Sequence, residues 1–420
     1  MIPRNQNVTA LDMNEERLRE NCSIENNCNP NQGKDIPMSA DKLAIREAQW
    51  NDADLSGIWD LCRQSFDAYR SCTLSEFREL QRHKWLTNPA RTPDHPFGWI
   101  LFNRKDGIVG FVGLVPVRLK IGAEVVIGAA GHTWVVSPAY RGYSLYSLSL
   151  YKQLLSWADK HFLLNTTSIE TTSRINRILR MTKIPVESFD RLLLWVIRPE
   201  ALVQWRLENS SWNQWSRMTA RRPFAWLLKV AARVRFVGHK RLRFHDATLP
   251  VEPVKVFTDE FTKFWEDHKH EYGIATVRDR TFLQWRHLDV PAIMGAMHVF
   301  ACRDNGRLQG YLALIERYRQ KGSCPGHFRV TDVFYDRHRQ DVVCSLMNYA
   351  FEFAKARGCS VFEVSKVSQE LGDLLRSQQP YVRQADSWTY WFKTPTPELA
   401  DVCRREVWWP SGSDGDSNLF

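Results

Sequence analysis

The chain has 420 residues, of which 44% are hydrophobic and 25% charged, and Lys and Arg exceed Asp and Glu by ten. This composition is typical of a globular protein and excludes a largely disordered one, and the length predicts two or three domains. No apolar run approaches the roughly 18 residues of a membrane-spanning helix, and the first residues lack the apolar core of a signal peptide. The nine cysteines are scattered, so we expect a cytoplasmic protein with reduced thiols and no metal site.

The first structured unit is predicted to begin with a β-hairpin. Residues 1–40 are rich in Asn, Glu and Pro and lack an apolar period, which predicts a disordered tail. In the following unit, predicted at 41–200, Trp99–Arg104 reads as a strand and Val109–Leu114 as its return strand. Asp106-Gly107 between them is a turn signal, so the two strands are expected to pair.

A helix and a further strand follow the hairpin, and the same order then returns. Apolar residues at helical spacing predict a helix over 145–158, and an apolar strand follows at 162–164. In the second half the hairpin consists of His298–Arg303, the turn Asn305-Gly306 and Gln309–Leu314. A helix over 342–354 and a strand over 361–364 follow it, which makes 250–395 an internal repeat of the first unit.

This order of strands and helices predicts an α/β (α+β) fold with two tandem mixed-sheet units flanked by helices. The segment that joins them, 201–249, carries most of the excess positive charge: Trp205 to His245 contains ten basic residues and one acid. Trp, Leu and Val alternate with these charges at helical spacing, so a basic amphipathic helical linker is expected. Residues 396–420 end in a Ser-, Gly- and Asp-rich run and are predicted to be a C-terminal tail.

One stretch of the first unit has the pattern of a phosphate-binding turn. Val135 and Val136 end a predicted strand, and a tight loop through Tyr140, Arg141 and Gly142 leads into the helix. A helix N-terminus presents free amides and a positive dipole to a pyrophosphate. Arg141 adds a fixed charge, and Gly142 permits close approach of the backbone.

The same stretch resembles the acyl-CoA loop of the GNAT acyltransferase superfamily, in a tandem two-unit bacterial type. The residues that carry the likeness are Val136-Ser137-Pro138-Ala139-Tyr140-Arg141-Gly142, set on a strand, loop and helix. The resemblance implies that acetyl-CoA or another acyl-CoA is the co-substrate. It assigns cofactor contacts to Trp134, Val135, Val136, Tyr140, Arg141, Gly142, Tyr143, Ser144, Leu145 and Ser173. Ser144 and Tyr146 stand where the family consensus has small residues.

Transfer of an acyl group to an amine needs a group that accepts the amine proton. Glu124 lies on the strand position where several GNAT enzymes carry a carboxylate base, His132 on the loop strand is an alternative, and Glu170 is a third candidate. The corresponding loop of the second unit, 330–341, has no Gly and three Asp, so we expect no cofactor there.

The predicted reaction is N-acylation of a small primary amine, and the family resemblance suggests an amino sugar or surface-polysaccharide precursor. Arg221 and Arg222 are expected to bind an acceptor that carries phosphate, in a cleft between the units floored by the basic segment. Residues 205–245 also suit an anionic membrane surface, which would make the protein membrane-peripheral; a nucleic-acid partner is not expected. Two alternatives remain: a non-catalytic GNAT-like binding protein and an aminoacyl-tRNA-dependent transferase.

Overall fold

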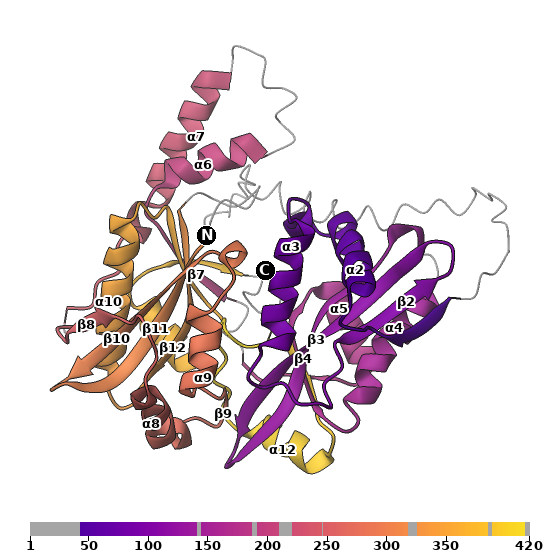
Figure 1. The fold of residues 1–420 in the computed structure, drawn as a ribbon. Helices are drawn as coiled ribbons and strands as arrows, with labels where there is room; N and C mark the ends of the chain where they lie inside the picture. Colours follow the sequence, from indigo (N-terminus) through magenta and orange to yellow (C-terminus); the bar gives the residue numbers. More distant parts are fainter. Residues whose placement is uncertain are drawn as a thin grey trace, which may run out of the picture. The chain divides into compact units, whose positions relative to one another are not determined.

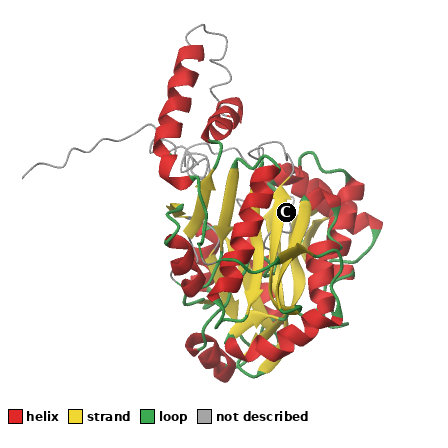
Figure 2. Cartoon of the chain, turned by 90° about the vertical axis from the view of Figure 1, so that its left-hand side faces the viewer, coloured by secondary structure: helices red, strands yellow, loops and turns green. Residues whose placement is uncertain are grey.

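The computed structural model describes residues 43–140, 144–186, 191–209, 221–245, 247–317, 326–384 and 389–415. Within these ranges the chain forms two mixed sheets with helices packed against them (Figures 1 and 2). The predicted α/β architecture with two sheet units is therefore confirmed. The predicted tail at 1–40 lies outside the described residues.

The first sheet has the strand order β1-β2-β3-β4-β5-β15-β6, and β9 pairs with β3. Its strands are β1 (Ala44–Glu47), β2 (Gly98–Asn103), β3 (Gly107–Ile121), β4 (Glu124–Val136), β5 (Phe162–Ser168), β6 (Thr182–Lys183), β9 (Ile274–Thr276) and β15 (Thr389–Lys393). The second sheet has the order β14-β7-β13-β12-β11-β10-β8. Its strands are β7 (Arg191–Val196), β8 (Val251–Pro253), β10 (Ala296–Asp304), β11 (Arg307–Arg317), β12 (His327–Tyr335), β13 (Val361–Ser365) and β14 (Tyr381–Gln384).

Helices cover both faces of each sheet. In the first half they are α2 (Asp52–Ser65), α3 (Leu74–Gln81), α4 (Ser144–Trp157) and α5 (Glu170–Ile178). In the second they are α8 (Asp259–His268), α9 (Arg280–Leu283), α10 (Gln340–Ala356), α11 (Gln369–Arg376) and α12 (Pro397–Arg405), and α6 (Pro199–Asn209) and α7 (Arg221–Arg235) lie between the halves in sequence. Short 3-10 turns are η1 (Asp67–Tyr69), η3 (Pro138–Tyr140), η6 (Val237–His239), η7 (Lys269–Glu271) and η9 (Ala292–Met294), and π-helical turns are η2 (Arg82–Leu86) and η8 (Gln284–Leu288).

The alternation of strand residues explains how the first sheet is covered. Ile100 and Phe111 belong to the core that includes α2 and α3, whereas Leu101 and Val112 belong to the core that includes α4. Successive residues of a strand point to opposite faces, so β2 and β3 bury both faces. The consequence is a three-layer unit in which α4 lies on the face opposite α2 and α3 (Figure 1).

Both predicted hairpins are present, with turns that their sequences explain. In the second, Asn305 and Gly306 have φ of 49° and 77°, as a two-residue type I′ turn requires. In the first, Gly107 alone is left-handed, with φ of 73°, and it ends a three-residue loop. The turn of each hairpin therefore lies where its Asn-Gly or Asp-Gly pair predicts.

The two sheets exchange strands, which the prediction of two consecutive units does not anticipate. β7 comes from the first half of the chain but lies between β13 and β14 of the second sheet. β15 comes from the second half but lies between β5 and β6 of the first sheet. The predicted boundaries at 200 and 250 therefore do not separate the strands of the two sheets, because each sheet needs a strand from beyond them.

The structure corrects the prediction of a C-terminal tail at 396–420. Residues 397–405 form α12, and every residue from 408 to 415 is buried. Trp408 packs on Phe392 of the first core at 5.5 Å between ring centroids, and Trp409 packs on Tyr272 of the second at 4.8 Å. The polar composition of this C-terminal segment (residues 408–415) suggests flexibility, but the fold satisfies its polar groups internally.

Asp414 shows how a polar side chain of the C-terminal segment is accommodated. Its carboxylate accepts hydrogen bonds from the Thr276 hydroxyl at 2.6 Å and from the Ser411 amide at 2.8 Å. Ser413 donates to the Thr331 carbonyl at 3.2 Å. These contacts attach the segment to β9 and β12 of the second half.

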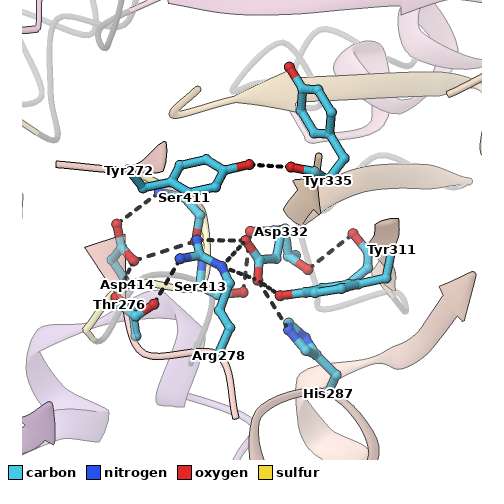
Figure 3. Close-up of polar contacts among 12 residues, drawn as sticks. Tyr272, Thr276, Arg278, His287, Tyr311, Asp332, Tyr335, Ser411, Ser413 and Asp414 are labelled. Carbon is cyan, nitrogen blue, oxygen red and sulfur yellow. Dashed lines mark hydrogen bonds and ion pairs between the residues drawn. The ribbon is translucent and has the colours of Figure 1, made fainter. Parts of the chain in front are cut away.

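Beside it lies a buried charged cluster built on Arg278 and Asp332 (Figure 3). The guanidinium and carboxylate are 3.0 Å apart, with side-chain exposures of 1% and 0%. Tyr311 donates to Asp332 at 2.7 Å, and His287 lies 3.7 Å from the same carboxylate. Burial alone would raise the pKa of Asp332, but the charge of Arg278 holds it well below the usual range. A pair of this kind is costly to break from one side.

Within the described ranges, no helix combines the length and apolarity that a bilayer crossing requires.

We predict that Trp409→Ala destabilises the fold by about 3–5 kcal/mol, because it removes a buried ring that touches the second core. Val407→Ala is the matched control, since that side chain is 61% exposed, and it should change the free energy of unfolding by less than about 0.5 kcal/mol. Denaturant unfolding measures both, and equal small effects would show that the C-terminal segment contributes nothing to the core.

Candidate active site

The first sheet opens where β4 and β5 separate. These parallel strands pair only from Gly128 with Phe162 to Gly131 with Asn165. β4 continues to Val136 and β5 to Ser168, so their ends diverge. Backbone groups along such a gap are not used by the ladder between the two strands and need other partners.

A β-bulge lies on β4 at the start of this gap. Gly113 of β3 pairs with His132, and Phe111 pairs with Val135, so Thr133 and Trp134 stand opposite Val112 alone. Thr133 has a φ of 51°, a rare conformation for a β-branched residue. Bulges and strained backbone of this type re-aim side chains and concentrate at functional sites.

From the bulge, β4 leads through η3 to α4, as the sequence predicts. Val135 and Val136 are buried in the sheet, and the Tyr140 hydroxyl donates to Asp106 in the first hairpin turn. Tyr146, one turn into α4, is 39% exposed. The predicted cofactor contacts Arg141, Gly142 and Tyr143 lie outside the described residues, as do the side chains of Ser144 and Leu145.

A buried hydrogen-bonded chain runs along the gap on the side of α4. Trp134 packs on Tyr151, with ring centroids 4.4 Å apart. Tyr151 donates to Asn176 at 2.7 Å and accepts from Asn165 at 3.1 Å. Burial raises the pKa of Tyr151 to about 12, so the phenol stays protonated.

Sequence reasoning places Tyr151 in the apolar stripe of the helix and misses Asn165 and Asn176. The sequence signal for this hydrogen-bonded chain is Asn165, which stands in the middle of the apolar strand 162–168, since a buried amide requires partners.

His132 lies on the other face of the gap. Its side chain is buried, Nδ1 lies 2.6 Å from the Thr133 hydroxyl, and Nε2 has no hydrogen-bond partner among the described residues. A Cβ on Gly113 would lie 2.4 Å from Nε2, so only glycine leaves room for the ring. Burial first, and the nearby charge of Lys84 second, lower the pKa of His132 well below its usual value. The imidazole is therefore neutral near pH 7, and it is a weaker base than a free imidazole.

Polar residues of α3 and η2 are buried on the same face, and sequence reasoning missed them. Gln81 is 0% exposed, and neither amide atom has a hydrogen-bond partner among the described residues. Lys84, one turn later, is also 0% exposed, with Nζ 3.5 Å from the Tyr69 hydroxyl. Charged and amide side chains on a helix are normally expected in solvent, so nothing in the local pattern points to their burial.

The structure does not bring the two predicted carboxylates to His132. Glu124 is exposed at the opposite end of β4, eight residues away, which is about 26 Å along a strand. Glu170 is the first residue of α5 rather than the end of a strand, and its exposed carboxylate pairs with Arg174 at 2.5 Å. Ser173 bonds the Thr389 hydroxyl at 2.8 Å and accepts from Trp391 at 3.3 Å, so it joins α5 to β15.

A groove of about 600 Å³ lies between the two halves. Its described lining comes from α3, η2 and the residues after it, and from α8, α9, η8 and the residues after that: Glu79, Arg82, His83, Thr87, Pro89, Asp259, Thr262, Arg280, Thr281, Gln284, Trp285, Asp289 and Pro291. None of these residues belongs to the basic segment 205–245, which was expected to floor a cleft between the units. Arg221 and Arg222 are the first residues of α7, and their side chains lie outside the described residues.

The equivalent place in the second half is filled by the protein. β12 and β13 stop pairing at Val330 and Val364, but only about 10 Å³ of space remains there, beside the C-terminal segment. In the turn before α10, the Arg337 amide donates to Glu271 at 3.0 Å and the His338 amide donates to Asp336 at 2.9 Å. The predicted acidic loop is in part a strand, and Asp332 is buried within it.

No protein-family model matches the chain, and no curated protein matches it in sequence. Solved structures do resemble it. A GCN5-related N-acetyltransferase from Anabaena variabilis superposes with a TM-score of 0.52 at 13% identity, over 86% of this chain and 74% of that one. Saccharomyces cerevisiae N-myristoyltransferase with bound myristoyl-CoA gives 0.54 at 12% identity, over 89% and 90%. A probable N-acyltransferase from Enterococcus faecalis gives 0.51 at 10% identity, over 84% and 72%.

The chain has the GNAT fold. The superpositions extend over both halves, which agrees with the two-sheet arrangement described above. The family resemblance inferred from the sequence is thus confirmed at the level of the GNAT fold.

We predict that Gly113→Ala destabilises the protein by about 1–3 kcal/mol, because the new methyl group overlaps the His132 ring. In the double variant with His132→Ala the overlap is removed, so the two effects should be strongly non-additive in denaturant unfolding. Gly238→Ala, where nothing lies within 4 Å of the added carbon, is the control. Additive effects at Gly113 and His132 would contradict the packing described.

Proposed function

We propose that the protein is an acyl-CoA-dependent N-acyltransferase whose reaction takes place in the first half of the chain. The observation that carries this proposal is the gap between β4 and β5, with its bulge at Thr133 and its direct continuation into the turn before α4. A thioester arm laid along the gap would lie between two strand ends that do not pair with each other, while its pyrophosphate would meet the N-terminus of a 14-residue helix. The shared fold with N-acetyl- and N-myristoyltransferases supports the same assignment.

The proposed reaction is a direct transfer. The acceptor amine attacks the thioester carbonyl carbon, a tetrahedral oxyanion forms, and the carbon–sulfur bond breaks to release the CoA thiolate. His132 accepts the proton that the amine loses, and that proton then passes to the thiolate. The support for this role is that the neutral ring lies at the bulge and that its Nε2 has no hydrogen-bond partner among the described residues.

The acceptor is proposed to be a small primary amine, such as an amino sugar or a surface-polysaccharide precursor. The groove between the halves supports its placement. η2 forms one wall: His83 lines the groove, and the charge of Lys84 acts on His132. Glu79 gives the groove a carboxylate that suits an ammonium group, whereas Asp259 is paired with Arg280 at 3.0 Å and Asp289 accepts from Gln284 at 2.7 Å.

The second half is proposed to bind no acyl-CoA. Turn amides that already donate to Glu271 and Asp336 are not available to a pyrophosphate, and two carboxylates at this position repel it. The second half then serves to complete the sheets and the groove.

Binding of acetyl-CoA by isothermal titration tests the assignment. We predict that Arg141→Glu weakens binding by about 10–100-fold, because a charge-assisted contact to phosphate is replaced by repulsion. His338→Glu is the matched control: it changes an exposed residue of the equivalent second turn and should leave the affinity unchanged. Absence of binding by the wild type at millimolar ligand would favour a non-catalytic binding protein, and salt-sensitive tRNA binding would favour an aminoacyl-tRNA-dependent enzyme.

We predict that His132→Ala lowers kcat by about 100-fold or more while acetyl-CoA affinity is retained. Because the pKa of His132 is held well below 6.5, its protonation does not change between about pH 6 and pH 8. The ratio of wild-type to variant rates should therefore be constant over that range, and acceptor protonation cancels in this ratio. A ratio that falls as the pH is lowered through 6.5 would mean that His132 titrates there and is not held neutral.

A further inference from the structure

α7 has two apolar faces, and only one of them packs on the protein. At 100° per residue, Leu228, Ala232 and Phe236 lie on the same side of the helix. Phe236 is buried and packs edge-on against Tyr381 of β14, with ring centroids 5.2 Å apart. This side turns toward the second sheet. Arg233 lies between this side and the opposite one, and its guanidinium is 3.7 Å from the Glu200 carboxylate of α6.

The opposite face of α7 carries large apolar side chains in solvent. Trp226, Leu227 and Val234 are 63%, 56% and 71% exposed, and Val237 just beyond the helix is 71% exposed. Val230 completes the stripe, one turn from both Trp226 and Val234. In Figures 1 and 2 the α6–α7 pair stands at one end of the second sheet. An exposed stripe of this kind is unusual for a surface helix and marks an interaction site.

The charge around this stripe has one sign. The sequence from Arg221 to His245 contains eight Lys and Arg residues and no Asp or Glu. Among those with described side chains, Lys229 and Arg233 lie beside the apolar stripe, and Lys240, Arg241 and Arg243 follow the helix. Arg235 lies on the other side and donates to the Tyr381 hydroxyl at 3.1 Å.

An apolar stripe flanked by positive charge favours one kind of partner over the others. A second copy of the chain would bring the same excess of positive charge against the first and would be repelled. A nucleic acid would satisfy the cations but would leave Leu227, Val230 and Val234 in water. A bilayer with anionic lipids satisfies both, because acyl chains accept the apolar stripe while headgroup phosphates meet the flanking Lys and Arg.

We propose that α7 docks on the surface of a membrane that contains anionic phospholipids. The stripe from Trp226 to Val237 covers twelve residues. Their eleven steps amount to about 17 Å at the rise of a helix, so the helix lies parallel to the surface. Trp226 is placed at the level of the headgroups, where indole rings are favoured. This proposal rests on α7 and not on the acyltransferase assignment.

Co-sedimentation of the full chain with sonicated vesicles tests the proposal. We expect binding to vesicles of phosphatidylcholine that contain about 30% phosphatidylglycerol. Binding to phosphatidylcholine alone should be at least about tenfold weaker, and binding to the anionic vesicles should be lost as salt is raised. Equal binding to both lipids, or no binding to either, would overturn the proposal.

The double variant Trp226→Ser/Val234→Ser should reduce binding to the anionic vesicles by about tenfold or more, because it removes the centre of the stripe. The matched control is Ile178→Ser/Val256→Ser, two apolar residues that are 76% and 57% exposed elsewhere. Circular dichroism and denaturant unfolding, unchanged in both, show that the variants are folded. If both double variants lose binding equally, or if neither does, α7 is not the docking surface.

Charge is tested separately by Lys229→Glu/Arg233→Glu, which should abolish the preference for phosphatidylglycerol. A wild type that binds RNA more tightly than these vesicles, or that dimerises through α7 in sedimentation velocity, would also overturn the proposal.

Discussion

Each sheet is completed by a strand from the other half of the chain, and the candidate active site depends on this exchange. β5 forms one side of the gap and is paired on its other edge with β15, whose residues 389–393 lie more than 200 positions later. Ser173, predicted as a cofactor contact, bonds Thr389 and Trp391 and so ties α5 to the exchanged strand. β5 is therefore paired on both edges only when both halves have folded, and changes near residue 390 are expected to reach the site through β5.

The two halves share a sheet pattern, but the polar groups near their separated strand ends have different surroundings. In the second, the protein supplies the partners: carboxylates accept from the turn amides, Arg278 neutralises Asp332, and the C-terminal segment fills the space. Such a buried pair requires the surrounding network to offset its desolvation. In the first, Tyr151, Asn165 and His132 are neutral groups along the gap, and the Thr166 carbonyl of β5 lies 3.5 Å from Lys366 Nζ. The space in the second half is filled, which agrees with placing the reaction in the first half.

Much of the fold follows from local signals, and the rest does not because it depends on distant partners. Asn305-Gly306, Asp106-Gly107 and the apolar period of α4 fix hairpins and helices within a few residues, so the sequence predicts them. β7 pairs with β13 and β14, which come from the other half of the chain, and no local sequence pattern around 191–196 indicates these partners. The same holds for the C-terminal segment. Its Ser and Asp residues indicate a flexible end, but in the fold the Thr276 hydroxyl donates to Asp414 and the Thr331 carbonyl accepts from Ser413. His132 was found as a candidate base, whereas Glu124 was misplaced by the length of β4.

The seam between the halves shows that the internal repeat has a direct structural role. η2 and η8 are π-helical turns at equivalent places, each followed by a proline, Pro89 and Pro291. Their second residues are His83 and Trp285, and these two rings stack on each other at 4.9 Å with an angle of 18° between planes. The Trp285 indole also donates to the His83 carbonyl at 2.9 Å.

π-Helical turns are rare and are retained mostly where function needs them. Here a pair of them joins the two halves, lines the groove and carries Lys84, whose charge lowers the pKa of His132. The contact that holds the repeats together is therefore also the contact that links the proposed acceptor groove to the proposed base.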